Sequence, residues 1–157
     1  KTSEFEKMFK TYCQKNLAKN VNYFSFLRKY TELQIAKMFA KYPKYFTAFS
    51  SCNVGLKTGE RWCGKCPKCL FTYLVLYPFL AQKDLHKIFG QDLFDPSTSS
   101  GREKLLSTMK RLLGQGKPKP FECVGTYQES RLAFKLSFKK ALRQAQGKPL
   151  PYLLTKL

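Results

Sequence analysis

Apolar residues recur at intervals of three and four along most of the chain, which is the spacing that gathers them on one face of an α-helix. Helices are expected after Ser3, after Thr31, from Pro67 towards Pro78, up to Gly90, over the apolar stripe that ends at Gly114, and from Thr126 to about Gly147. No segment shows the strict alternation of a half-buried strand. The pattern predicts a mainly α-helical fold, with at most a small hairpin in the turns near residues 50–66.

Three of these helices begin with a capping box, in which Ser or Thr is followed three positions later by Glu or Gln. The pairs are Ser3 with Glu6, Thr31 with Gln34, and Thr126 with Glu129. Pro67 suits the first turn of its helix, where a missing backbone N–H costs nothing.

Two stretches without helical periodicity separate the helices. Residues 50–66 contain three glycines and are expected to form a loop, and residues 95–101 are expected to form a loop or flexible insert. We therefore expect a single helical domain over residues 1–157. It would include a metal loop at 51–69 and a C-terminal helix and tail at 126–157.

The composition favours a folded protein without membrane spans. The chain has 157 residues, of which 43% are hydrophobic, enough for one domain with a modest core. Its longest apolar run, from Leu70 to Leu80, is too short to cross a bilayer. Because no signal peptide is recognisable, a cytoplasmic protein is expected.

The charge is strongly positive. Lys and Arg number 29 against 10 Asp and Glu, which gives a formal net charge of +19. Such a field favours anionic partners, including nucleic acid, nucleotides and phosphorylated substrates. A plain solvated surface explains the charge equally well, because the cations are spread along the chain.

Four of the six cysteines lie close together, in the pattern Cys52, ten residues, Cys63, two residues, Cys66, two residues, Cys69. This spacing predicts one four-thiolate metal site, most simply structural zinc with no open coordination position. An iron–sulfur cluster is the rival, but its ferredoxin pattern requires a fourth cysteine followed by Pro. Free or buried thiols are the remaining alternative.

Five segments resemble a known family. They are Ser51–Asn53, Trp62–Cys69, Tyr23–Arg28, Glu32–Ala36 and Lys119–Gly125. The first two look like the C-terminal metal loop of PP-loop (N-type) ATP pyrophosphatases, including the 7-cyano-7-deazaguanine synthases. Together the five resemble the UDP-N-acetyl-α-D-muramoyl-L-alanyl-L-glutamate epimerases.

The resemblance implies an isomerase of peptidoglycan precursor synthesis. That family converts the terminal L-Glu of UDP-MurNAc-L-Ala-L-Glu to D-Glu, using ATP and magnesium and releasing AMP and pyrophosphate. Adenylation would remove the carboxylate charge that makes the neighbouring α-proton weakly acidic, so that a general base can take it. The Ser-Gly-Gly-x-Asp-Ser loop that holds ATP is missing from this sequence. We therefore expect the chain to be the C-terminal part of a larger α/β PP-loop enzyme, with its ATP-binding domain upstream.

Several residues are candidates for the chemistry. Cys123 precedes a capped helix whose dipole would favour a thiolate base, and Glu122 beside it is a second candidate base or a magnesium ligand. Arg28, Lys119 and Arg131 are candidates for binding the oxyanions of the nucleotide-sugar dipeptide. The alternatives are a small buried cysteine, an exposed carboxylate and ordinary surface cations.

Two other functions stay open. A zinc-containing nucleic-acid-binding module would use the positive charge and the abundant Tyr and Phe. Another PP-loop enzyme, such as a 7-cyano-7-deazaguanine synthase, would share the metal loop.

Overall fold

The chain divides into two compact units, Lys1–Thr31 and Glu32–Leu157. The computed structural model describes residues 2–116, 118–120 and 124–157, and within these ranges every regular element is helical. The expectation of a mainly α-helical fold is confirmed for this part of the chain. The first unit buries a single described residue, Cys13.

The N-terminal unit begins with α1 (Ser3–Tyr12), which continues as a turn of π-helix, η1 (Cys13–Leu17). The helix is capped one residue earlier than expected, because the Thr2 hydroxyl accepts a hydrogen bond from the Phe5 N–H at 3.2 Å. The predicted capping box of Ser3 and Glu6 is therefore wrong.

Glu6 instead fixes the segment that returns along α1. Its carboxylate accepts the Ser25 N–H at 2.9 Å and forms an ion pair with Arg28. The Phe9 ring meets the Tyr23 ring edge-on, with 4.7 Å between the ring centroids. These few contacts connect residues 23–28, which form no regular element, to α1.

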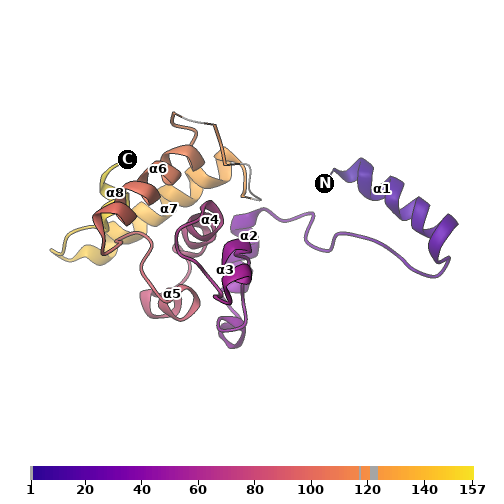
Figure 1. Ribbon diagram of the computed structural model, residues 1–157, viewed down its shortest axis with the longest axis horizontal. Helices are drawn as coiled ribbons and strands as arrows, with labels where there is room; N and C mark the ends of the chain where they lie inside the picture. The colour runs from indigo at the N-terminus through magenta and orange to yellow at the C-terminus, as the bar shows by residue number, and fades with distance from the viewer. Residues whose placement is uncertain (1, 117, 121–123) are drawn as a thin grey trace. The chain divides into compact units, whose positions relative to one another are not determined.

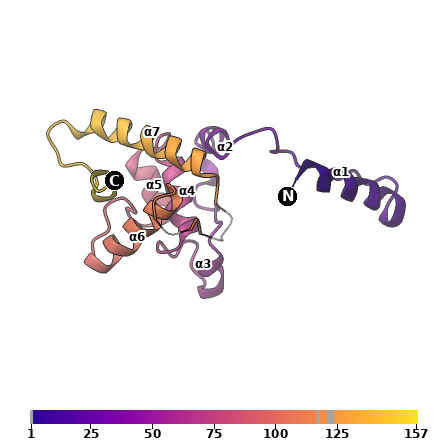
Figure 2. The ribbon, with the colours of Figure 1, turned by 90° about the horizontal axis from the view of Figure 1, so that it is seen from above.

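The C-terminal unit is a set of helices around α4, as Figures 1 and 2 show. Its elements are α2 (Glu32–Phe39), η2 (Pro43–Tyr45), α3 (Asn53–Thr58), α4 (Pro67–Leu76), α5 (Gln82–Phe89), α6 (Ser99–Leu112), α7 (Tyr127–Ala145) and α8 (Tyr152–Thr155). Helix α4 contacts α2, α5, α6 and α7, and α8 packs on α6 and α7.

Helix α4 is central because apolar residues surround nearly its whole circumference, so no face of it tolerates water. From Cys69 onwards all but one of its residues are buried. Each large apolar side chain that it buries contributes roughly 1.5–3 kcal/mol. The largest fully buried side chains of the unit are Tyr73, Phe46, Phe94, Leu70, Leu74, Leu85, Ile88, Leu93, Met109, Leu112, Leu153 and Leu154.

Two stretches expected to be loops contain helix. Helix α3 lies inside residues 50–66, and α6 begins at Ser99, inside residues 95–101. In each case a side chain supplies the cap: Cys52 accepts the Gly55 N–H and Thr98 accepts the Gly101 N–H. The hairpin considered for residues 50–66 does not form, since these described residues contain no strand.

The ends of α7 and α5 agree with the sequence. Thr126 and Glu129 form the predicted capping box of α7, and α7 ends at Ala145, before Gly147. Helix α5 ends at Gly90, whose φ of 72° is left-handed and favours glycine. Among the described residues, no helix has both the length and the hydrophobicity needed to cross a membrane.

Candidate metal centre

Cys52 enters the site as the cap of a short helix. Its sulfur accepts the N–H of Gly55 at 3.2 Å, and its side chain is fully buried. Gly55 allows this approach, because a Cβ on it would stand 2.4 Å from the backbone oxygen of Glu60. The packing of α3 against the chain that follows it therefore positions the first thiol.

Cys66 and Cys69 come from the first turn of α4. Cys66 caps the helix, and its sulfur accepts the Cys69 N–H at 3.5 Å. Pro67 occupies the first helical position, as predicted. Since residues three apart lie on one side of a helix, the two sulfurs face the same point.

Cys63 is turned towards the other thiols by Gly64. The φ of Gly64 is +66°, and a Cβ there would meet the side chain of Gln91 at 2.0 Å. The left-handed backbone conformation favours glycine here, whereas the exposed Gln91 side chain could move aside.

All four sulfurs lie within 4.8 Å of one another. The sulfur–sulfur distances are 3.8 Å from Cys52 to Cys66, 3.8 Å from Cys63 to Cys69, and 3.5 Å from Cys66 to Cys69. Zinc–sulfur bonds of about 2.3 Å in a tetrahedron give edges of about 3.8 Å. All four cysteines are free of disulfides, and the cluster therefore has the donor set and spacing of a tetrahedral thiolate site.

The thiols share protons unequally. The hydrogen bond from Cys69 lowers the pKa of Cys66 to about 5, although burial works against this. The pKa of Cys69 is raised, first by that same hydrogen bond and then by burial. Burial also raises the pKa of Cys63. A divalent cation would replace the shared protons and relieve this cost of burial.

Trp62 is part of the hydrophobic core next to the cluster. Its indole N–H donates to the Phe49 oxygen at 3.1 Å, and its ring lies 4.7 Å from that of Phe89, centroid to centroid. The side chain is buried, so it is not available to stack on a nucleotide base.

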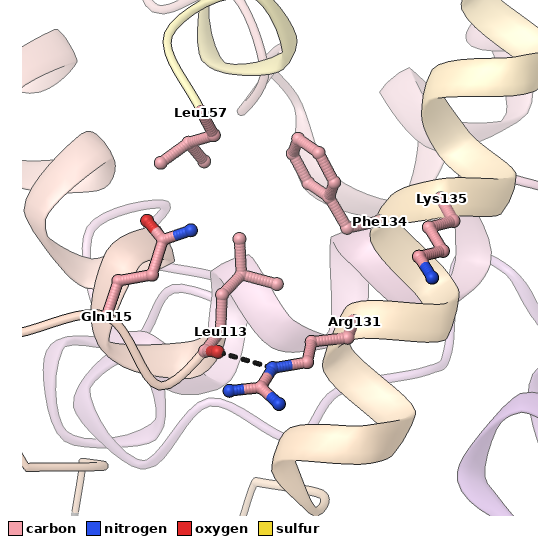
Figure 3. Close-up of a pocket in the computed structure, with 6 residues that line it drawn as sticks. All are labelled: Leu113, Gln115, Arg131, Phe134, Lys135 and Leu157. Atoms are coloured by element: carbon pink, nitrogen blue, oxygen red, sulfur yellow. Dashed lines mark hydrogen bonds between the residues drawn. The ribbon is translucent and has the colours of Figure 1, made fainter.

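Lys119 and Arg131 lie near the start of α7, and backbone oxygens hold both. The Lys119 ammonium donates to the Val124 oxygen at 3.1 Å. The Arg131 Nε donates to the Leu113 oxygen at 2.8 Å, as Figure 3 shows, on the wall of a cavity of about 320 Å³. Lys135 lines the same cavity one turn further along α7.

Of the remaining predicted site residues, the structure describes Arg28 alone. Arg28 belongs to the N-terminal unit, where it pairs with Glu6. Cys123 and Glu122 fall outside the residues that the structure describes.

Glu129 does more than cap α7. Its Oε2 accepts the Thr126 N–H, and its Oε1 accepts the N–H of Glu32 at the start of α2, both at 2.9 Å. Burial works to raise the pKa of Glu129, but these two N–H groups outweigh it and lower the pKa. Burial and then the charge of Glu129 raise the pKa of Glu32. The capping box was visible in the sequence, whereas the bond between α2 and α7, 97 residues apart, was not.

Comparison with known proteins identifies the chain's relatives. Residues 48–149 match the MurL C-terminal domain family. The UDP-N-acetyl-alpha-D-muramoyl-L-alanyl-L-glutamate epimerase of Xanthomonas oryzae pv. oryzae is 42% identical over 134 residues, which is 82% of this chain and 28% of the relative. Proteins of the same name come from a Micromonospora species, with 41% identity, and from Salinispora tropica, with 42% identity. Each match covers 73% of this chain, and the matches cover 25% and 24% of the two relatives, respectively.

The chain thus spans about a quarter of the length of these relatives. No solved structure was found to match it. The family match covers most of the C-terminal unit, including all four clustered cysteines. The chain belongs to the MurL C-terminal domain family.

Proposed function

We propose that this chain is the C-terminal region of an ATP-dependent epimerase that converts the terminal L-Glu of UDP-MurNAc-L-Ala-L-Glu to D-Glu. The observation that carries the proposal is the 42% identity to the Xanthomonas oryzae epimerase over 82% of this chain. Such an enzyme would make a precursor of peptidoglycan and would work in the cytoplasm, where nucleotide-linked precursors are found.

The length of the relatives indicates which part of a full-length enzyme would bind ATP. The chain corresponds to 28% of the Xanthomonas oryzae protein, and its sequence contains no phosphate-binding loop of the PP-loop type. We assign ATP and magnesium to the region upstream of this one in a full-length enzyme. The substrate carboxylate would attack the α-phosphorus of ATP and expel pyrophosphate, and hydrolysis of the acyl adenylate after epimerisation would release AMP.

The four-thiolate cluster is proposed to hold a structural zinc ion. Cys52, Cys63, Cys66 and Cys69 would fill all four tetrahedral positions, so the ion would bind no water for hydrolysis. Its role would be to fasten α3 and the following loop to the start of α4. The ion would offset two of the four negative charges of the thiolates.

We propose the catalytic base and the substrate-binding residues from the chemistry of their side chains. A base beside the activated glutamyl group would take the α-proton, and the same or a second group would return it on the opposite face. Cys123 and Glu122 are our candidates for this base. Arg28, Lys119 and Arg131 are our candidates for contacts with the diphosphate and carboxylates of the substrate.

A direct experiment joins this chain to the upstream three quarters of the Xanthomonas oryzae relative. The chimera is incubated with UDP-MurNAc-L-Ala-L-Glu, ATP and magnesium. The nucleotide product is then hydrolysed in acid, and the glutamate that this frees is resolved on a chiral column. We expect D-Glu together with one AMP per turnover, and no D-Glu from residues 1–157 alone. A folded chimera that forms neither D-Glu nor AMP would refute the proposal.

The nucleic-acid alternative has less support from the fold. It required aromatic rings that stack on bases, but several of the rings of the C-terminal unit pack against one another in its core. Activity on carboxydeazaguanine distinguishes the epimerase from the second alternative, a 7-cyano-7-deazaguanine synthase. The synthase would convert this substrate, and an epimerase would not.

A further inference from the structure

The N-terminal unit exposes an unusual amount of apolar surface. Among the described residues, nine of the seventeen exposed large apolar side chains fall within residues 2–31. Phe26 is 77% exposed and Met8 is 69% exposed. We call the nine the N-terminal apolar surface: Phe5, Met8, Tyr12, Leu17, Val21, Tyr23, Phe24, Phe26 and Leu27.

The unit cannot keep this arrangement by its own contacts. Its described part buries only Cys13, and its aromatic packing consists of Phe9 against Phe5 and Tyr23. A segment of about 30 residues is below the size at which a hydrophobic core alone sustains folding, and an isolated ten-residue helix is marginal in water. The order of this segment therefore requires a surface that covers it.

The spacing on α1 shows what kind of surface fits. Phe5, Met8 and Tyr12 recur at intervals of three and four, so they form one stripe of the helix. Met8 and Tyr12 share one open face of the continuous helix α1–η1 with Lys7 and Lys15. A matching partner surface is apolar in the middle and carries carboxylates at its margin.

The lengths of the relatives indicate where that surface comes from. This chain matches 28%, 25% and 24% of the three relatives, so about three quarters of each lies outside the match. The family is a C-terminal domain, so the remainder of these relatives precedes the matched region. Residues 2–31 precede the matched region, residues 48–149, along the chain. A covalently joined neighbour has a high effective concentration.

We propose that the N-terminal apolar surface docks on the upstream, nucleotide-binding part of the same polypeptide in a full-length enzyme. This segment would then couple the two parts of the enzyme instead of serving as a passive linker. The inference rests on the proposed function only in taking the chain as the C-terminal part of a longer protein.

Amide hydrogen exchange on the chimera described above tests the docking without reference to epimerase activity. Peptides covering residues 5–27 should exchange at least tenfold more slowly in the chimera than in residues 1–157 alone. The variants Met8→Asp and Phe26→Asp should restore fast exchange there and leave α4 and α7 protected. Leu142→Asp, which alters an exposed leucine of the other unit, should leave residues 5–27 protected.

Three results would overturn the proposal. Equal exchange in the chimera and in the isolated chain would show that the upstream part does not cover the surface. Protection in the dilute isolated chain would place the segment on residues 32–157, and protection that rises with its concentration would indicate a second copy. A protected chimera without epimerase activity would instead uphold the docking and refute the proposed function.

A second measurement removes the dependence on a correctly folded chimera. The upstream part of the Xanthomonas oryzae relative is produced separately and titrated with fluorescently labelled residues 1–157. Saturable binding that weakens at least tenfold with Phe26→Asp, and not with Leu142→Asp, is expected. No binding at tens of micromolar, to an upstream part whose fold is verified by circular dichroism, would contradict the docking.

Discussion

The sulfurs of Cys66 and Cys69 lie 3.5 Å apart across the first turn of α4, with the Cys69 N–H directed at the sulfur of Cys66. The positive end of the helix dipole and this N–H favour a thiolate at Cys66. The same arrangement that starts the central helix of the unit therefore brings together two of the four clustered thiols. Folding of α4 and binding of a cation are expected to be coupled.

Replacement of Cys66 by Ser tests this coupling. The variant loses one of four thiolates, while its hydroxyl can still cap α4, so we expect loss of the bound metal and, through it, of the cooperative unfolding transition. Metal content and circular dichroism at 222 nm measure the two effects together. Cys13→Ser is the matched control, because Cys13 is a free cysteine outside the cluster, and it should retain a full complement of metal.

A second prediction concerns the backbone beside Cys52. Gly55→Ala would place a methyl group 2.4 Å from the Glu60 oxygen, a backbone atom that cannot move alone. We expect a loss of about 1–3 kcal/mol in the free energy of unfolding, as for other overpacked sites, together with weaker metal retention against a chelator.

Gly59→Ala is the control for that variant. Its φ of +78° disfavours alanine, but nothing lies within 4 Å of the new methyl group. It should cost roughly 1–2 kcal/mol without changing metal retention. Equal chelator resistance of the two variants would mean that Gly55 does not position Cys52.

The sequence predicted the metal cluster well because its information is local. Cys63, Cys66 and Cys69 fall within seven residues, and Pro67 marks the helix that orients the last two. Helix α3 was missed because Gly55 and Gly59 are typical of loops, and because Cys52 is not among the common capping residues. The structure shows Gly55 as a close-approach position inside the helix.

Features that depend on residues far apart could not be predicted. The sequence pattern of α1 is that of any amphipathic helix, so nothing in it separates residues 1–31 from the domain. The cap at Thr2 could not be predicted from the local sequence. Glu6, the expected partner of Ser3, instead accepts the Ser25 N–H and pairs with Arg28, both far from it in sequence.

A third prediction uses the bond between α2 and α7. Glu129→Gln replaces a charged acceptor of the Thr126 and Glu32 N–H groups by a neutral one, which should cost about 1 kcal/mol at pH 7. Because the pKa of Glu129 is lowered by folding, its contribution is present above the unfolded-state pKa of about 4.3. The contribution disappears as the pH falls through the folded-state pKa below that value.

Urea unfolding from pH 3 to pH 7 measures this dependence. The difference between the parent and Glu129→Gln should shrink towards zero at the acid end. Glu103→Gln changes an exposed carboxylate of α6 and should give a small difference at every pH. A Glu129→Gln effect independent of pH would assign the loss to packing and not to charge.

A fourth prediction concerns Lys140 of α7. Its ammonium donates to the oxygens of Tyr77, at 2.6 Å, and of Leu80, just beyond the end of α4, and burial lowers its pKa. Lys140→Met leaves these oxygens without their charged donor, so we expect a loss of about 1–3 kcal/mol. Thermal unfolding measures the loss, and Lys139→Met at the exposed neighbouring position should change it by less than about 0.5 kcal/mol. Equal effects of the two variants would contradict this role.

The most direct test of the central claim is the metal content of the chain, purified without added metal and examined by X-ray absorption. We expect one zinc per chain with four sulfur neighbours at about 2.3 Å, and unfolding when it is chelated. Iron with acid-labile sulfide, or a folded chain with four titratable thiols and no metal, would contradict the account.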